Sequence, residues 1–90
     1  MDASIKELSL HIRRNGFDYY QELATDTGYI YRQEDNGKVV AYEVFKRKIN
    51  SQYNCISFPK DNAFGIWAWS CRTIDEAKKK METFLCIPTT

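Results

Sequence analysis

The fold is decided by residues 64–85, which read FGIWAWSCRTIDEAKKKMETFL. Trp67, Trp69 and Cys71 alternate with small or polar residues, and this period of two is typical of a half-buried strand. Thr73 and Glu76 then have the spacing of a capping box, in which each side chain satisfies a backbone N–H at the start of a helix. The stretch therefore predicts a strand that runs directly into a capped helix.

The predicted helix carries an apolar stripe on one side. Trp67 and Trp69 point to the same side of a regular strand, and that side offers the largest apolar area for the stripe to cover. We therefore expect the helix to fold back on the face of the sheet that carries both indoles. The stripe consists of Ile74, Ala77, Met81, Phe84 and Leu85.

A first helix is expected over residues 4–14. Ser4 and Glu7 have the spacing of a second capping box, and the apolar residues that follow recur at helical intervals. Asn15 and Gly16 would supply the left-handed conformation that ends many helices. The apolar stripe is narrow, so this helix should lie at a surface or an edge.

A hairpin is predicted around Asn36 and Gly37. An Asn-Gly pair between two β-rich segments favours a type I′ turn, because both central residues need positive φ. With this pair at the tip, Tyr31 lies opposite Tyr42, and the register gathers apolar side chains on one face. The expected core face comprises Phe17, Tyr19, Leu23, Tyr29, Tyr31, Val40, Tyr42, Val44, Trp67, Trp69 and Cys71.

The predicted order is helix, four strands, helix, with strands near residues 17–24, 29–34, 39–46 and 67–71 and a short apolar segment at 55–58. We expect an α+β fold, an antiparallel β-meander of three to four strands with an N-terminal and a C-terminal helix packed on one face. Residues 1–90 should form a single domain, since a chain this short cannot support two cores.

The composition is that of an ordinary globular protein. Of the 90 residues, 43% are hydrophobic and 28% are charged, and the formal net charge is +1. These values exclude a disordered chain and a generic polycation. Two Trp, six Tyr and five Phe residues make the chain rich in aromatic groups, which suit both a small core and an interface.

The sequence also carries signals about location. We expect no membrane span, because no apolar run approaches 18 residues, and no signal peptide at the N-terminus. Cys55, Cys71 and Cys86 are widely spaced and odd in number, which favours reduced thiols and a cytoplasmic location. Cys71 should be nearly buried and unreactive, and no disulfide is expected.

Catalytic and metal-binding patterns are weak. His11 is the single histidine, and no Cys/His spacing matches a zinc site. There is no glycine-rich phosphate loop, and no serine or cysteine is convincingly paired with a base. We therefore predict no enzyme activity, no cofactor and no metal.

The sequence indicates two candidate interaction surfaces. The sheet face away from the helices would expose aromatic and apolar groups, which suit a protein partner or a homodimer through the sheet. Glu22, Glu34 and Glu43 on the same face would repel phosphate. The candidate partner-binding residues are Tyr20, Ile30, Arg32, Phe45 and Arg47.

Nucleic-acid binding is the alternative. Residues 38–90 carry nine basic and five acidic side chains, and aromatic groups lie among them. The candidate phosphate-contacting residues are Lys46, Lys48, Lys78 and Lys79. Residues 78–80 also fit a simple solvated helix face, with Asp75–Lys79 and Glu76–Lys80 pairs one turn apart.

Residues 64–69, 73–77 and 42–46 (FGIWAW, TIDEA and YEVFK) resemble a group of small uncharacterised proteins of bacteriophages and their bacterial hosts. The resemblance implies a phage or mobile-element accessory protein and brings no activity or site with it. The aromatic strand before a Thr-x-x-Glu-Ala helix is also similar to the arm-binding domains of phage-type integrases. The acidic sheet face departs from DNA binding, and no contact residue is transferred.

From these observations we expect a small non-enzymatic interaction module that binds a protein partner. A nucleic-acid-binding module is the alternative.

Overall fold

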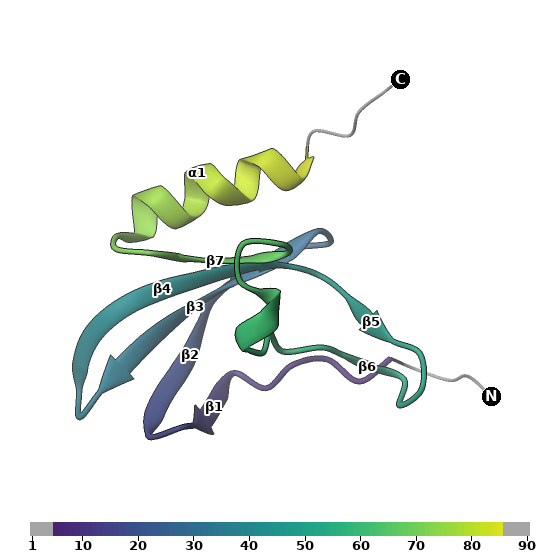
Figure 1. Cartoon of the computed structure of the whole chain (residues 1–90), viewed down its shortest axis with the longest axis horizontal. Helices are drawn as coiled ribbons and strands as arrows, with labels where there is room; N and C mark the ends of the chain where they lie inside the picture. The colour runs from purple at the N-terminus through teal and green to yellow at the C-terminus, as the bar shows by residue number, and fades with distance from the viewer. Residues whose placement is uncertain (1–4, 86–90) are drawn as a thin grey trace.

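The structure is a computed structural model and describes residues 5–85. A five-stranded antiparallel sheet forms its centre (Figure 1). Its strands follow the order β1 (His11–Arg14), β2 (Phe17–Ala24), β3 (Gly28–Asp35), β4 (Lys38–Lys46) and β7 (Ala68–Cys71). The remaining elements are a small hairpin of β5 (Ile49–Asn50) and β6 (Cys55–Ile56), the 3-10 helix η1 (Asp61–Ala63) and the helix α1 (Ile74–Leu85).

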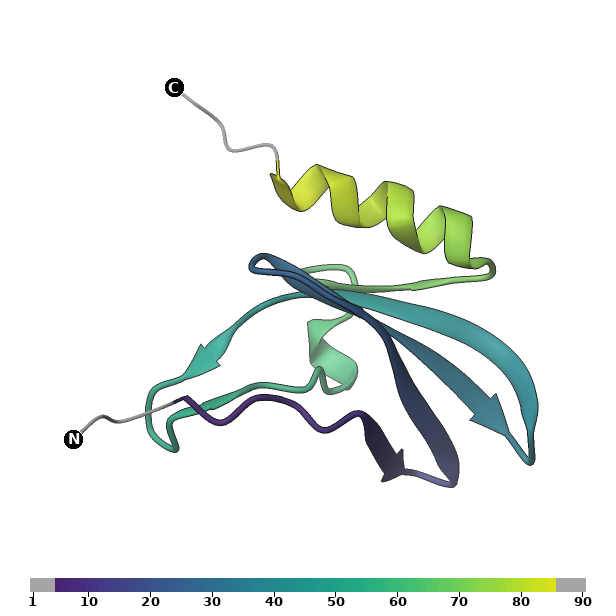
Figure 2. The same ribbon diagram turned by 180° about the vertical axis from the view of Figure 1, so that it is seen from behind.

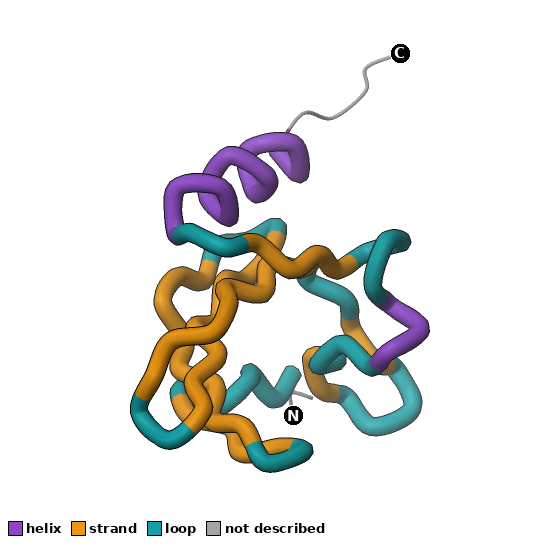
Figure 3. Tube along the Cα trace, turned by 60° about the vertical axis from the view of Figure 1, so that its left-hand side comes forward, coloured by secondary structure: helices purple, strands orange, loops and turns teal. Residues whose placement is uncertain are grey.

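The curved sheet is covered on both faces. The helix α1 lies on the outer face, over β3, β4 and β7, which we call the helix side (Figure 1). The segment before β1, the β5–β6 hairpin and η1 lie on the inner face, which we call the loop side and which Figure 2 shows from behind. In Figure 3 the loop segments close around this inner face while the helix stays apart from them.

The helix side has a small, mostly aliphatic core. Ile30, Val44, Ala77 and Met81 are buried there, and Trp69 packs on the Phe84 ring at a centroid distance of 5.6 Å. The helix begins at the predicted cap, because the Glu76 N–H donates to Thr73 Oγ1 at 3.1 Å. The Glu76 carboxylate accepts from the Arg72 N–H, one residue before the N–H that a capping box uses.

Gly28 lets the helix approach the sheet. A Cβ at this position would lie 2.7 Å from the Phe45 carbonyl oxygen and 2.8 Å from Phe84 Cδ2, so only glycine fits. Among residues 5–85, no helix is both long and apolar enough to cross a membrane.

The loop side has an aromatic core. Tyr31 stacks on Phe45 at 5.7 Å, and Phe58 meets the same Phe45 ring edge-on at 5.4 Å. The buried members of this core are Tyr19, Tyr29, Tyr31, Phe45, Ile56, Ala63 and Ala68.

The segment before β1 is extended, and the prediction of an N-terminal helix is wrong. Residues 11–14 form β1, and Asn15 and Gly16 have φ of 54° and 85°, as in the two-residue turn at Asn36 and Gly37 (52° and 84°). The apolar residues Ile5, Leu8 and Ile12 pack against the loop-side core from this extended segment. The fold is therefore an antiparallel meander with one C-terminal helix, and the helix-flanked α+β arrangement is corrected.

The register of the β3–β4 hairpin also differs from the prediction. Pairing starts as expected, with Asp35 opposite Lys38, but a shift between Gln33 and Glu34 leaves Val40 as an extra residue in β4. Beyond this bulge Tyr31 lies opposite Glu43, where Tyr42 was expected. A shift of one residue moves every later side chain to the other face.

The predicted core face is consequently divided. Phe17, Tyr19, Tyr29, Tyr31 and Trp67 belong to the loop side, whereas Tyr42, Val44, Trp69 and Cys71 belong to the helix side. Leu23 and Val40 are exposed. The two tryptophans thus lie in different cores, because Trp67 precedes β7 and packs against Phe45 while Trp69 is opposite Val44.

Candidate anion-binding cleft

The predicted partner-binding residues do not share one open sheet face, because segments within residues 5–85 cover both faces of the sheet. Ile30 and Phe45 have no exposed surface and belong to the helix-side and loop-side cores, so neither is available to a partner. Arg47 donates to Glu7 Oε2 at 2.6 Å and so ties the N-terminal segment to the chain that leaves β4. This pair and the Tyr29 hydroxyl hold the pKa of the Glu7 carboxyl below its usual value, with the Tyr29 hydrogen bond as the larger cause.

Tyr20 and Arg32 remain at the surface. Tyr20 on β2 lies opposite Arg32 on β3, and both side chains are half-buried on the helix side of the sheet. The Arg32 guanidinium lies 5.0 Å from the centroid of the Tyr20 ring and forms ion pairs with Glu22 and Glu34. Arg32 therefore already has two carboxylate partners.

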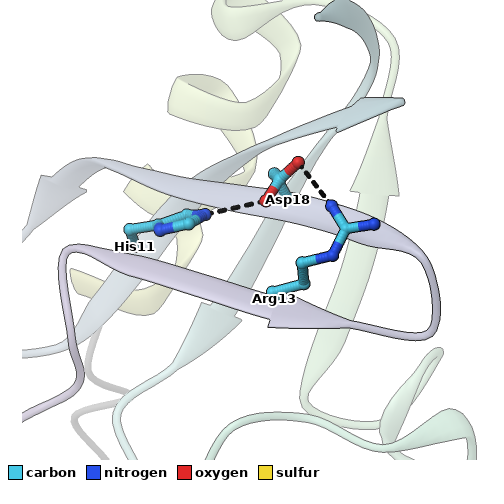
Figure 4. A network of polar contacts seen from close by, with 3 residues as sticks. All are labelled: His11, Arg13 and Asp18. Carbon is cyan, nitrogen blue, oxygen red and sulfur yellow. Dashed lines mark hydrogen bonds and ion pairs between the residues drawn. The ribbon is translucent and has the colours of Figure 1, made fainter. Parts of the chain in front are cut away.

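His11, Arg13 and Asp18 form a polar network on the β1–β2 hairpin (Figure 4). His11 Nε2 lies 2.8 Å from Asp18 Oδ1, and Arg13 Nη1 donates to Asp18 Oδ2 at 2.8 Å. These contacts, that of His11 above all, hold the pKa of the Asp18 carboxyl below its ordinary value. Residues 5–85 hold no group of three or more His, Cys, Asp or Glu side chains arranged to bind a metal ion.

The four lysines proposed to contact phosphate are separated. Lys46 lies over the Phe84 ring at 5.8 Å, and Lys78 and Lys79 are exposed on α1. Lys48 alone lies on the loop side, where its Nζ is 5.1 Å from the centroid of the Trp67 ring. The predicted set is therefore not one site.

A cleft of about 630 Å³ opens on the loop side between the β5–β6 hairpin and the segment that leads to β7. Three cations, Arg14, Lys48 and Lys60, line this basic cleft together with the rings of Phe58 and Trp67. The Arg14 guanidinium lies 5.6 Å from the Phe58 centroid. None of the described residues that line the cleft is acidic.

The three cations of the basic cleft form no ion pair with a carboxylate among residues 5–85. The ion pairs in this part of the chain involve His11, Arg13, Arg32 and Arg47 instead. Like charges gathered in a concave surface with apolar walls concentrate the electrostatic potential. The cleft therefore favours an anionic group.

A smaller cavity of about 220 Å³ adjoins the cleft and shares Arg14, Phe58 and Lys60 with it. Glu43 lines this inner cavity and is only 8% exposed. Burial raises the pKa of the Glu43 carboxyl to about 7, with Asp61 acting in the same direction and Arg14 against it. The β-bulge at Val40 is what turns Glu43 to this side of the sheet.

Arg14, Phe58 and Lys60 were not predicted as site residues from the sequence, and Glu43 was expected on an open face. Trp67 was expected in a core, and it packs against the loop-side core as well as lining the cleft. A usable signal was present, since residues 44–60 contain four basic residues and no acidic one. The Asn-Gly pair at 15–16 could also have indicated a turn that brings Arg14 beside the sheet.

The two described thiols are free and half-buried. Cys55 lines the basic cleft. Cys71 is less buried than expected, and its partial burial, with the nearby Glu76 carboxylate, raises the pKa of its thiol. Cys86 lies outside the described residues.

Neither a protein-family model, nor a curated protein, nor a solved structure matches this chain.

Proposed function

We propose that the protein is a non-enzymatic binding module that holds a short stretch of single-stranded nucleic acid in the basic cleft. The supporting observation is the combination of Arg14, Lys48 and Lys60 with the rings of Phe58 and Trp67 in one cleft without an acidic lining residue. Cations paired with aromatic rings are the usual means of binding single strands.

The cations and the aromatic rings of the basic cleft would bind different parts of a strand. Lysine and arginine side chains neutralise phosphates, and flat rings or guanidinium planes stack on bases. Arg14 and Lys48 lie over the rings of Phe58 and Trp67, so a base can stack on the Arg14 guanidinium, or on a ring once its cation has turned to a phosphate. Stacking contributes about 1–3 kcal/mol per base.

The sequence argued against nucleic-acid binding because Glu22, Glu34 and Glu43 were expected on one sheet face, and the structure separates Glu43 from the other two. Glu22 and Glu34 pair with Arg32 on the helix side, away from the cleft, and Glu43 is buried in the inner cavity. The acidic groups therefore do not form a surface that would repel a strand from the basic cleft.

A protein partner is the second candidate, and exposed apolar residues favour it. Ile49, Tyr53 and Ile66 are 48%, 69% and 70% exposed, and Ile66 lines the cleft. Such residues beside three cations would suit an acidic protein segment with apolar side chains, from another protein or from a second copy of this chain. A cytoplasmic location, which the free thiols support, and a phage or mobile-element origin belong to the proposal in either form.

The test is a salt titration of binding to a fluorescent thymidine oligomer, measured by anisotropy. Each neutralised phosphate of a single strand contributes about −0.7 to the slope of log K against log salt, so three cations predict a slope of about −2. A duplex of equal length should bind more weakly, because its bases are not free to stack on the rings.

Charge variants locate the site. Arg14→Gln, Lys48→Gln and Lys60→Gln should each weaken binding and reduce the slope by about 0.7. Lys78→Gln and Lys79→Gln remove the same charge from α1 and serve as matched controls that should bind normally. Absence of binding, or equal losses in the controls, would contradict the proposal, and tight binding of an acidic peptide alone would favour the second candidate.

A further inference from the structure

The inner cavity combines aromatic rings with polar and charged side chains, among them the buried carboxyl group of Glu43 and the exposed one of Asp61. The rings of Phe17, Tyr19, Phe58 and Phe64 line it, and the Glu43 side chain lies among them. Its volume of about 220 Å³ is below the ~300–1,000 Å³ of sites for drug-sized ligands, so it accepts a group about the size of one base. Because it shares Arg14, Phe58 and Lys60 with the basic cleft, one ligand can occupy both.

We propose that the inner cavity receives one base of the bound strand and that the Glu43 carboxylate selects guanine. This inference rests on the proposed function and adds base specificity to it. The phosphates next to the inserted base would then lie among the three cations of the basic cleft.

The selection follows from hydrogen-bonding patterns. A carboxylate offers two oxygen acceptors side by side and no donor. Guanine presents two adjacent donors, N1–H and the 2-amino group, on its Watson–Crick edge. Adenine and cytosine each present a donor next to an acceptor, and thymine presents one donor between two carbonyls. Guanine alone can therefore donate twice to Glu43 without bringing an acceptor against it.

Other side chains of the inner cavity could also contact a guanine base bound to Glu43. Arg14 and Lys60 line the same cavity and can donate to the O6 atom of guanine. Gln33 donates from Nε2 to the Tyr19 hydroxyl at 3.1 Å, which holds the Tyr19 ring in the wall. Flat rings on several sides suit a flat base, as in pockets that read an extruded base by stacking and by its Watson–Crick edge.

The preference should depend on pH. Glu43 accepts two hydrogen bonds only when ionised, and burial raises the pKa of its carboxyl to about 7. The charged or titratable groups that face it are Arg14 from β1, Tyr19 from β2 and Lys60 and Asp61 from the segment at η1. The selectivity for guanine should therefore be strong at pH 8 and decline as the pH falls through 7.

The experiment uses thymidine pentamers whose central base is guanine, hypoxanthine, adenine, cytosine or thymine. At pH 8 the guanine pentamer should bind about tenfold or more tightly than the adenine one, as expected for a two-bond contact to a base. Hypoxanthine lacks the 2-amino group and should fall between them. Glu43→Gln should abolish the preference for guanine, because an amide offers one acceptor and one donor in place of two acceptors.

Glu82→Gln, an exposed residue of α1, is the matched control and should keep the preference. Equal affinity for all five pentamers, or a preference that survives Glu43→Gln, would overturn this inference while the proposed function stands. Binding of none of them would overturn both. If Glu43→Gln does not fold, the comparison of guanine with hypoxanthine on the unaltered protein decides the question, and equal binding of these two refutes the contact.

Discussion

The two sides of the sheet are covered in different ways. On the helix side, α1 satisfies its own backbone hydrogen bonds and needs only an apolar surface beneath it, so Ile30, Val44, Ala77 and Met81 suffice. On the loop side the cover is extended or irregular chain, whose N–H and C=O groups need partners. Hydroxyl groups in the core supply some of them, since the Tyr31 hydroxyl donates to the Ser9 carbonyl at 2.6 Å.

This difference helps to explain why the basic cleft and the inner cavity lie on the loop side. Irregular segments do not interdigitate along a repeating stripe, and they leave the basic cleft and the inner cavity on their side. A buried carboxyl group such as Glu43 is tolerated there because its proton can be retained near neutral pH. We infer that the helix side provides stability and the loop side provides the binding site.

The largest expected effect comes from truncating one core at a time. Phe45→Ala should lower the free energy of unfolding by about 3–5 kcal/mol and Ile30→Ala by about 2–5 kcal/mol, since both side chains are fully buried. Hydrogen exchange on the two variants distinguishes the sides. Phe45→Ala should speed exchange in residues 47–67, and Ile30→Ala should speed it in α1; the same pattern in both would mean that the cores are not separate.

The next effect concerns the pH dependence of stability. The pKa of Glu43 rises from 4.5 to about 7 on folding, so the folded state binds more protons between these values and the free energy of unfolding falls as the pH rises through them. At about 1.4 kcal/mol per pKa unit, the loss is up to about 3 kcal/mol. Above pH 7 this loss of unfolding free energy is complete.

Urea unfolding at several pH values measures this loss. Glu43→Gln lacks the titrating group, so its stability relative to the unaltered protein should increase from pH 4.5 to pH 8. Glu82→Gln, which removes an exposed carboxyl group on the helix side, is the matched control. A constant difference between Glu43→Gln and the unaltered protein would mean that Glu43 titrates normally in the folded state.

The smallest effect is on the helix side, at the start of α1. Thr73→Ala removes the side-chain acceptor for the Glu76 N–H and should cost about 1 kcal/mol, while Thr73→Ser retains the acceptor and should cost less. Thermal unfolding compares the two. Because the cap is far from the basic cleft, oligonucleotide affinity should not change in either variant, and a loss of affinity would contradict the separation of the two sides.

Features set by local chemistry could be predicted from the sequence. The capping box located the start of α1, and the turn residues located the ends of β2, β3 and β4 closely. The tip of the β3–β4 hairpin was also found, because Asn36 and Gly37 are suited to positive φ. Each of these depends on neighbours in the sequence.

Features set by distant contacts could not be predicted. Nothing near Val40 marks it as a bulge, yet this one residue turns Glu43 toward the loop side. Ile5, Leu8 and Ile12 have helical spacing, but an extended segment also brings all three to the core. The basic cleft was missed for the same reason, since Arg14, Lys48 and Lys60 come from three separate segments that only the tertiary fold brings together.

The pairing of Lys6 with the β5–β6 hairpin has a consequence for synthesis. The Lys6 N–H donates to the Asn54 carbonyl at 2.8 Å, and the Ile56 N–H donates to the Lys6 carbonyl at 3.0 Å. On the ribosome, at about 5–20 residues per second, residue 6 emerges roughly 2–10 seconds before these partners do. Until then the aromatic surface of β2 and β3 stays uncovered, and the late, long-range closure slows folding. The wall of the cleft that contains Cys55 and Ile56 therefore cannot form until residues 54–56 have emerged and met the N-terminal segment.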